Sequence, residues 1–158
     1  MRKILLHIAL IFFGINLAAA SPDSPVGYWK TIDDVSGKVK SVIRITETHH
    51  QTLTGQLVKI YPRKGETEAE LCVECRGEKH NKPILGMIIL TGLKKSKSQW
   101  EGGKILDPSS GKSYRLTIKP IANGEKLRVH GYIGLPLFGR TQIWERTDTH
   151  LVDRRFKE

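Results

Sequence analysis

Two cysteines, Cys72 and Cys75, are separated by two residues and are the only cysteines of the chain. Such a pair suits a disulfide in an oxidising compartment, a thiol-disulfide exchange centre, or half of a metal site. His80, and the pair His49 and His50, would supply further donors to a metal. An exchange centre normally opens a helix in a βαβ unit, and a strong zinc signature contains two such pairs. The flanks show neither, so a structural disulfide is the favoured interpretation, with redox and metal chemistry as alternatives.

Hydrolytic chemistry finds little support in the sequence. The chain contains no Gly-x-Ser-x-Gly elbow, no His-Glu-x-x-His helix and no glycine-rich phosphate loop. Asp33, Asp34 and Asp107 would serve as acid or base, but each stands where a turn uses Asp for its own backbone hydrogen bonds. We therefore predict a protein that is not an enzyme and has no catalytic residues, cofactor or metal.

Aromatic residues mark the two ends of the candidate domain. Gly27-Tyr28-Trp29 opens the first expected strand, and Trp144-Glu145-Arg146 lies in the last. A Gly-x-Trp on the first strand with a basic residue on the last resembles the signature of lipocalins and related barrels, in which the base stacks on the indole. This resemblance implies structural roles for Gly27, Trp29 and Arg146.

The elements that position these residues are expected to be strands. No long window after residue 20 has apolar residues at helical spacing, whereas short windows alternate or are rich in β-branched and aromatic residues. We predict eight strands: Val26 to Ile32, Ser41 to Thr48, Thr52 to Tyr61, Ile84 to Leu93, Gln99 to Leu106, Ser113 to Ile121, Lys126 to Ile133 and Arg140 to Thr147.

The connections between these strands are mostly short. Asn123-Gly124 is typical of a two-residue hairpin, and tight turns imply antiparallel neighbours. We therefore predict an all-β, up-and-down antiparallel barrel, because closure removes exposed edges. A two-sheet sandwich is the alternative. Pro62 to Pro83 is a long polar connection that holds both cysteines, and long loops often act as lids or binding loops.

The N-terminus predicts export. Arg2 and Lys3 precede an apolar run from Ile4 to Leu17, and Ala18-Ala19-Ala20 offers small residues for cleavage before Ser21. The run is shorter than the roughly 20 residues of a membrane span, which disfavours an uncleaved anchor. We expect a signal peptide over residues 1–20, one domain over residues 21–158, and a periplasmic or secreted location.

The charge of the expected mature chain favours anionic partners. Removing Arg2 and Lys3 from 26 basic residues leaves 24 against 16 acidic ones, about +8 with neutral histidines. The basic residues are spread along the chain and form no nucleic-acid motif, so nucleic acid is disfavoured. Anionic lipid, polysaccharide or protein of the cell envelope is the partner class that we expect for an interaction module.

A longer series of motifs spans nearly the whole expected mature chain: Gly27-Tyr28-Trp29, Asp33-Asp34, Gly37-Lys38, Ser41, Arg44-Ile45, Gly55, Leu57, Cys72-x-x-Cys75, Lys82-Pro83-Ile84, Gly86-Met87, Trp100-x-Gly102-Gly103-x-Ile105, Asp107-Pro108, Gly111-Lys112, Gly131-Tyr132-Ile133-Gly134 and Gly139-Arg140-Thr141-Gln142-x-Trp144-x-Arg146. This series resembles one bacterial family, catalogued as domain of unknown function 2147. Its members are small exported barrel-like proteins without an established reaction, so the resemblance implies no catalytic residues here. His130 departs from the resemblance, which favours Arg before Gly131-Tyr132.

The favoured function is binding of a small apolar or amphipathic ligand inside the barrel. Eight-stranded barrels are filled by side chains or hold one small ligand. Strand alternation places Arg140, Gln142 and Trp144 on one face of the last strand, and predicts a polar and aromatic cluster there. The candidate ligand-binding residues are Arg44, Tyr61, Trp100, Tyr132, Arg140, Gln142 and Trp144, and Trp29 and Tyr114 are further candidate wall residues.

Overall fold

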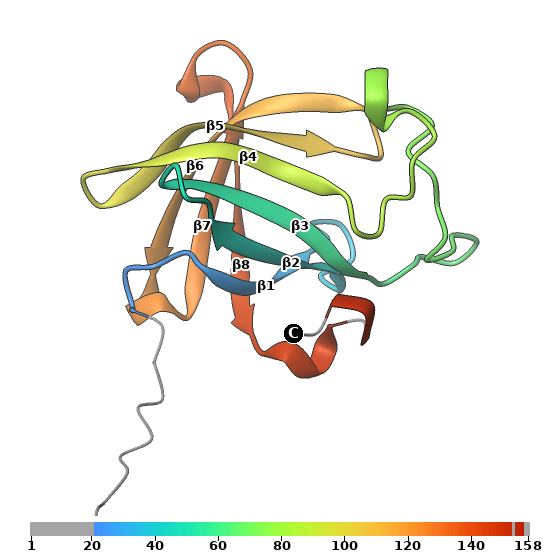
Figure 1. Cartoon of the computed structure of the whole chain (residues 1–158), viewed down its shortest axis with the longest axis horizontal. Coiled ribbons are helices and arrows are strands. Elements are labelled where there is room, and N and C mark those ends of the chain that lie inside the picture. Colours follow the sequence, from blue (N-terminus) through green and yellow to red (C-terminus); the bar gives the residue numbers. More distant parts are fainter. Residues whose placement is uncertain (1–20, 153, 157–158) are drawn as a thin grey trace, which may run out of the picture.

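The computed structural model describes residues 21–152 and 154–156, and strands form most of their regular structure. Figure 1 shows the strands wrapped around one interior. They are β1 (Gly27–Ile32), β2 (Val39–Glu47), β3 (Thr52–Ile60), β4 (Ile88–Ser96), β5 (Gln99–Asp107), β6 (Lys112–Ile121), β7 (Lys126–Tyr132) and β8 (Arg140–Thr147). The short 3-10 turns are η1 (Gly77–Lys79), η2 (Ala122–Gly124), η3 (Pro136–Phe138), η4 (Thr149–Leu151) and η5 (Arg154–Phe156).

The eight strands form a closed antiparallel barrel in chain order. Each strand pairs with the next, and β8 returns to pair with β1, where Trp29 lies opposite Arg146. The predicted up-and-down barrel is therefore confirmed, and the sandwich alternative is not the fold. The predicted signal peptide lies outside the described residues. Within those residues, no helix is long and apolar enough to cross a membrane.

Strand alternation fills the barrel with apolar side chains. On β2, Ile43 and Ile45 are buried at 2% and 0% exposure, while Arg44 between them is only partly buried. This is the period of two that a strand with one buried face requires. The interior side chains form one continuous core that includes Trp29, Trp100 and Trp144.

The fourth strand begins later than the sequence predicts. We expected it to start at Ile84, but β4 starts at Ile88. The chain turns at Gly86, whose positive φ of 88° suits glycine. Its N–H donates to the carbonyl of Leu57 at 2.7 Å, and the N–H of Leu57 donates to Met87 at 3.0 Å. The strand also ends at Ser96, three residues after the predicted Leu93, whereas the ends of the other seven strands lie within two residues of their predicted positions.

The connection at Asn123-Gly124 is longer than a two-residue hairpin. Ile121 and Lys126 face each other across β6 and β7, so four residues form the turn. Asn123 and Gly124 do take the positive φ that their types favour, at 54° and 85°. Ala122 also takes a positive φ, at 51°, which its type does not reveal.

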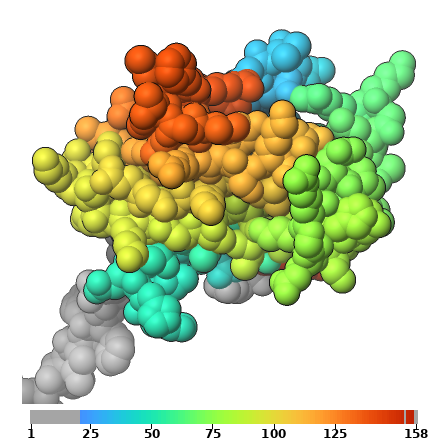
Figure 2. Space-filling view, turned by 90° about the horizontal axis from the view of Figure 1, so that it is seen from above, coloured from blue at the N-terminus to red at the C-terminus, as the bar shows by residue number. Residues whose placement is uncertain are grey.

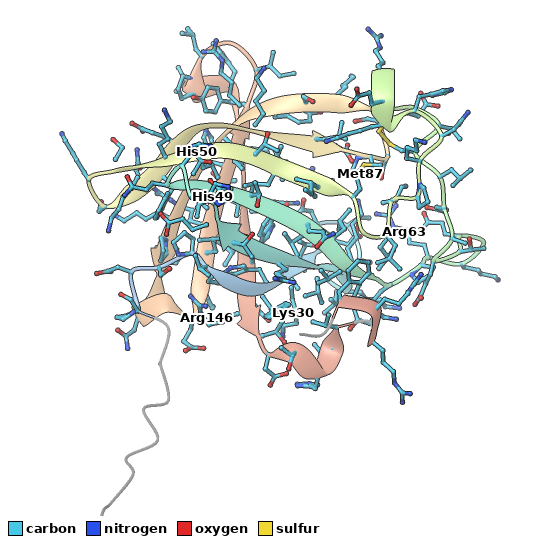
Figure 3. All side chains as sticks on the ribbon, viewed as in Figure 1. Lys30, His49, His50, Arg63, Met87 and Arg146 are labelled. Carbon is cyan, nitrogen blue, oxygen red and sulfur yellow. A yellow bond between two sulfur atoms is a disulfide. The ribbon has the colours of Figure 1, made fainter. Side chains whose placement is uncertain are left out.

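Arg146 closes one end of the barrel. Its guanidinium lies 4.3 Å from the centre of the Trp29 ring, a cation–π contact. The same group donates to three backbone carbonyls, those of Gly124 at 2.6 Å, Ser24 at 2.9 Å and Val26 at 3.0 Å. Burial lowers the pKa of this guanidinium. Figure 3 shows Arg146 near the start of the described chain and Arg63 on the far side of the molecule.

Gly27 makes room for this closure. A Cβ atom at Gly27 would lie 2.7 Å from Nη1 of Arg146, and the φ of Gly27 is 132°. A larger residue would therefore displace the guanidinium and strain the backbone. The structural roles that the resemblance implied for Gly27, Trp29 and Arg146 agree with these contacts.

The C-terminal turns cover an outer face of the sheet. Val152 packs with Val42 and Val58, which point away from the barrel interior. Phe156 packs on the same cluster, and the C-terminal segment lies below β1 in Figure 1. The barrel therefore has a second, smaller apolar cluster outside its main core.

We expect R146A to lower the free energy of unfolding by about 2–4 kcal/mol, because three carbonyls lose a charged donor and Trp29 loses its cation. R146K keeps the charge without the planar fork and should lie between R146A and the unchanged protein. Urea unfolding measures these effects. The control R128A, at an exposed position on β7, should change little, and an R146A protein as stable as R128A would contradict the role given to Arg146.

Candidate functional site

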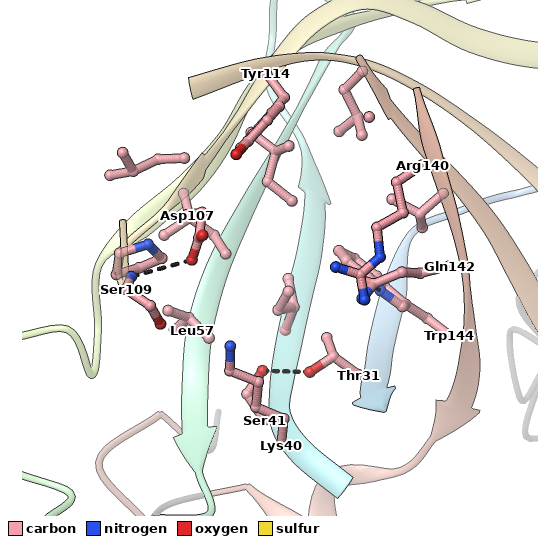
Figure 4. A pocket seen from close by; sticks show the side chains of 18 of the residues that line it. Thr31, Lys40, Ser41, Leu57, Asp107, Ser109, Tyr114, Arg140, Gln142 and Trp144 are labelled. Carbon is pink, nitrogen blue, oxygen red and sulfur yellow. Dashed lines mark hydrogen bonds between the residues drawn. The ribbon is translucent and has the colours of Figure 1, made fainter. Parts of the chain in front are cut away.

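A cavity of about 520 Å³ enters the barrel at the end opposite Arg146. Residues from the β1–β2, β3–β4, β5–β6 and β7–β8 ends of the sheet line it. Figure 4 shows Arg140, Gln142 and Trp144 side by side on β8, across the cavity from Leu57. The barrel thus has one sealed end and one open end.

The inner part of the cavity is apolar. Ile43, Leu57, Ile89, Leu116 and Val129 line it, one from each of five strands, and each is less than one tenth exposed. These positions are the inward-facing members of their strands. The floor therefore offers no charged group to a molecule that enters the barrel.

Aromatic hydroxyls and charges surround the opening. Tyr61, Tyr114 and Tyr132 line the cavity close to the ends of their strands. Lys40 also lines it, and Figure 4 shows its amine directed into the open space. A bound molecule would therefore meet apolar surface inside and hydrogen-bonding groups outside.

A polar network on β8 connects the cavity wall to the β1–β2 loop. Arg140 forms an ion pair with Asp34, and Nε2 of Gln142 donates to Oδ2 of the same carboxylate at 2.7 Å. Nε1 of Trp144 lies 3.3 Å from Oε1 of Gln142 and donates to it. The predicted cluster of Arg140, Gln142 and Trp144 is thus present and faces the cavity.

The neighbouring Asp33 holds the other side of the β1–β2 loop. It forms an ion pair with Arg63 on the long β3–β4 connection. The backbone N–H and the hydroxyl of Ser36 both donate to Asp33, at 2.8 and 2.7 Å. The hydrogen bond from the Ser36 hydroxyl is the largest influence that holds the pKa of Asp33 well below its usual range. Asp33 and Asp34 therefore attach the loop to two different sides of the opening.

Two predicted ligand-binding residues do not line the cavity. Arg44 lies between the inward-facing Ile43 and Ile45, so strand alternation places it on the other face of β2. Trp100 is buried near the start of β5, toward the sealed end, and borders a different hollow beside His50. The candidate wall residue Trp29 is also absent from the lining because it belongs to the closure around Arg146.

The sequence analysis missed contributions from the connections. Ile84 and Phe138 line the cavity from the β3–β4 and β7–β8 connections. The adjacent Asp33-Asp34 pair was a usable signal, but we interpreted it only as turn chemistry. Asp33 does bond within its own turn, whereas Asp34 pairs with a residue 106 positions further along the chain.

Cys72 and Cys75 form a disulfide, which confirms the favoured interpretation of the pair. Both residues are buried, at 0% and 3% exposure, and belong to the main core. The loop that carries them packs so closely on the β5–β6 turn that a Cβ at Gly111 would lie 1.8 Å from the carbonyl oxygen of Glu74. The location favours a fixed staple over an exchange centre, which must expose its sulfur.

The histidines do not assemble with the cysteines. Nδ1 of His80 lies 3.0 Å from the carbonyl oxygen of Cys75, within hydrogen-bonding distance. His49 and His50 pack edge to face on the β2–β3 turn. In residues 21–152 and 154–156, no group of three or more His, Cys, Asp or Glu side chains is arranged to hold a metal ion.

Comparisons with known proteins agree with this architecture. A family model described as an uncharacterised protein conserved in bacteria, DUF2147, matches residues 27–146. A solved structure of protein HP1028 from the human pathogen Helicobacter pylori, described as belonging to the lipocalin family, has a TM-score of 0.66 and 21% sequence identity. The match covers 78% of this chain and 82% of that one. No curated protein matches the sequence.

We expect the double variant C72A/C75A to lose about 2 kcal/mol of unfolding free energy, because a small closed ring constrains the unfolded chain only modestly. In the folded protein the disulfide should resist dithiothreitol and become reducible in urea. Mass spectrometry after thiol alkylation measures this. V73A, at an exposed position inside the ring, is the stability control. Rapid reduction of the folded protein would instead favour an exchange centre.

Proposed function

The chain belongs to the bacterial family of uncharacterised proteins DUF2147, and we propose that it is an exported, non-enzymatic binding protein. Its ligand in this proposal is one small apolar or amphipathic molecule held in the barrel. The observation that carries the proposal is the one-ended cavity, with an apolar floor and a polar opening. Its volume, about 520 Å³, lies in the range of roughly 300–1,000 Å³ of small-molecule sites.

The chemistry of the opening supports an amphipathic ligand in particular. An apolar part of the ligand would replace water against Leu57, Leu116 and Val129, which is favourable because apolar surface leaves water. A polar part would then lie at the level of Gln142 and Tyr132, which offer both donors and acceptors. The two regions are joined in one space, so a single molecule would reach both.

Three aspartates at the opening already have structural partners, which supports binding rather than catalysis. Asp33 and Asp34 pair with arginines. Asp107 accepts from the N–H of Ser109 at 3.1 Å and from the hydroxyl of Ser110 at 2.7 Å. Each carboxylate thus stabilises a turn or joins two loops. A general acid or base must instead be within reach of a bound substrate.

Export is supported by the disulfide and by the N-terminal sequence pattern. Disulfides persist mainly in oxidising compartments, and Cys72 and Cys75 are paired in the described chain. The positive, apolar and small-residue sequence of residues 1–20 is that of a cleavable signal. The proposed location is the periplasm or the medium.

Filling the cavity provides the test of binding. Gly131 lines the cavity, and a Cβ there would meet its nearest neighbour, Cβ of Tyr114, at an ordinary 3.7 Å. G131L should therefore occupy the cavity without backbone strain and weaken binding about ten-fold or more. Native mass spectrometry of protein isolated from its own cells measures ligand retention, and the fluorescent probe 1-anilinonaphthalene-8-sulfonate measures affinity.

The matched control is T91L, which adds a leucine at an exposed position on β4. It should retain ligand and probe like the unchanged protein. Absence of any retained molecule, together with probe binding that G131L leaves unchanged, would overturn the binding proposal. Thermal unfolding of G131L shows whether the barrel itself survives the substitution.

We expect the mature protein to begin at Ser21, because Ala18 and Ala20 provide the small residues that signal peptidase recognises. N-terminal sequencing of protein recovered from cell fractions tests this. A20R should block cleavage, whereas S21A should leave cleavage unchanged. An uncleaved protein in the cytoplasmic fraction would contradict the proposed export.

A further inference from the structure

Five apolar side chains are exposed on the β1–β2 and β7–β8 loops at the open end of the barrel. Four belong to the β7–β8 connection, where Leu137 and Phe138 are 85% and 75% exposed, and the fifth is Val35 on the β1–β2 loop, at 95%. Exposed apolar clusters at one place usually mark an interaction surface. We call this set the apolar rim: Val35, Ile133, Leu135, Leu137 and Phe138.

The apolar rim is held in position by polar contacts. His130 places one ring nitrogen 2.8 Å from the carbonyl oxygen of Pro136 and the other 2.8 Å from the hydroxyl of Thr141. Gly139 lets this ring approach, since a Cβ there would lie 2.5 Å from the imidazole. The β7–β8 loop is therefore anchored on both sides while its apolar side chains remain largely exposed.

Basic residues flank the apolar rim on two sides. No charged residue occurs between Gly131 and Gly139. On one side, β6 presents the exposed Lys112 and Arg115, the latter in register with Tyr132 at the end of β7. On the other side, Lys38 and Lys40 are exposed on and beside the β1–β2 loop. The nearby Asp34 is paired with Arg140. An apolar surface flanked by cations complements a bilayer whose anionic headgroups lie above its acyl chains.

The shape of the apolar rim favours a bilayer over a protein partner. Figure 2 shows the orange-red β7–β8 loop and the blue β1–β2 loop at the same margin of the molecule, and Asp34 of the β1–β2 loop pairs with Arg140 at the start of β8. A stable protein interface needs about 800 Å² and 20–30 residues per partner. A projecting loop with a few apolar side chains inserts into the boundary between headgroups and acyl chains without a matching surface.

From these observations we infer that the open end of the barrel docks on an anionic lipid bilayer, with the apolar rim inserted and the flanking lysines and arginines at the headgroups. Docking would point the cavity opening at the membrane. In that orientation an apolar molecule passes between the bilayer and the barrel without crossing water. The transfer of a molecule between bilayer and barrel rests on the proposed ligand-binding function, whereas docking on the bilayer does not.

A tryptophan placed in the apolar rim reports insertion directly. The three native tryptophans are buried, so they provide a constant background. With vesicles of phosphatidylcholine and phosphatidylglycerol, F138W should shift its emission to shorter wavelength and be quenched by brominated lipid. I143W, on the outer wall of β8, should show neither change. Vesicles of phosphatidylcholine alone should bind more weakly, and added salt should weaken binding to the anionic vesicles.

Serine substitutions test whether the apolar rim carries the affinity. L137S/F138S should bind anionic vesicles roughly ten-fold more weakly in a flotation assay, whereas I143S should bind like the unchanged protein. Equal binding by L137S/F138S, or an unquenched F138W on protein that does bind, would overturn the inference. Self-association that L137S/F138S abolishes, measured by sedimentation, would assign the apolar rim to a second copy instead.

The cavity-filling variant G131L distinguishes failure of the docking inference from failure of the proposed ligand binding. G131L leaves the apolar rim intact and should bind vesicles like the unchanged protein. Vesicle binding without any retained ligand would reject the binding proposal alone. A retained ligand without vesicle binding would reject the docking inference alone.

Discussion

The return of β8 to β1 is the contact on which the rest of the molecule depends. Without it the sheet has two open edges and no enclosed interior. The same pairing places Arg146 opposite Trp29, so closing the sheet also builds the seal of one end. Inward-facing residues near that seal pack tightly, whereas those at the opposite end leave a cavity. The two ends of the barrel therefore differ because the contact of Arg146 with Trp29 seals only one of them.

Much of this fold was predictable because its signals are local. Alternation in segments such as Ile43 to Ile45 fixes which side chains point inward, and turn residues fix where strands stop. The predicted start of β4, Ile84, was wrong by four residues. Apolar composition does not reveal that the chain turns at Gly86, where Gly86 and Met87 both form backbone hydrogen bonds with Leu57. Ala122 likewise takes a positive φ that only the assembled turn imposes.

The site was predictable where a single strand builds it, and not where loops from distant segments meet. Arg140, Gln142 and Trp144 share one face of β8 by simple periodicity, and they do line the cavity. Arg44 and Trp100 were chosen by residue type, and their strand positions place them elsewhere. The contacts of Asp34 with Arg140 and of Asp33 with Arg63 join segments far apart in sequence, and no local pattern reports them.

The first and last strands of the chain pair with each other to close the barrel, and this pairing affects folding kinetics. The β1–β8 ladder brings together residues more than one hundred positions apart, so it carries a large loop-closure entropy. Proteins dominated by such distant contacts fold slowly. A chain that has not yet placed β8 has neither the seal nor the β8 wall of the cavity. The cavity is therefore complete only after the pairing most distant in sequence has formed.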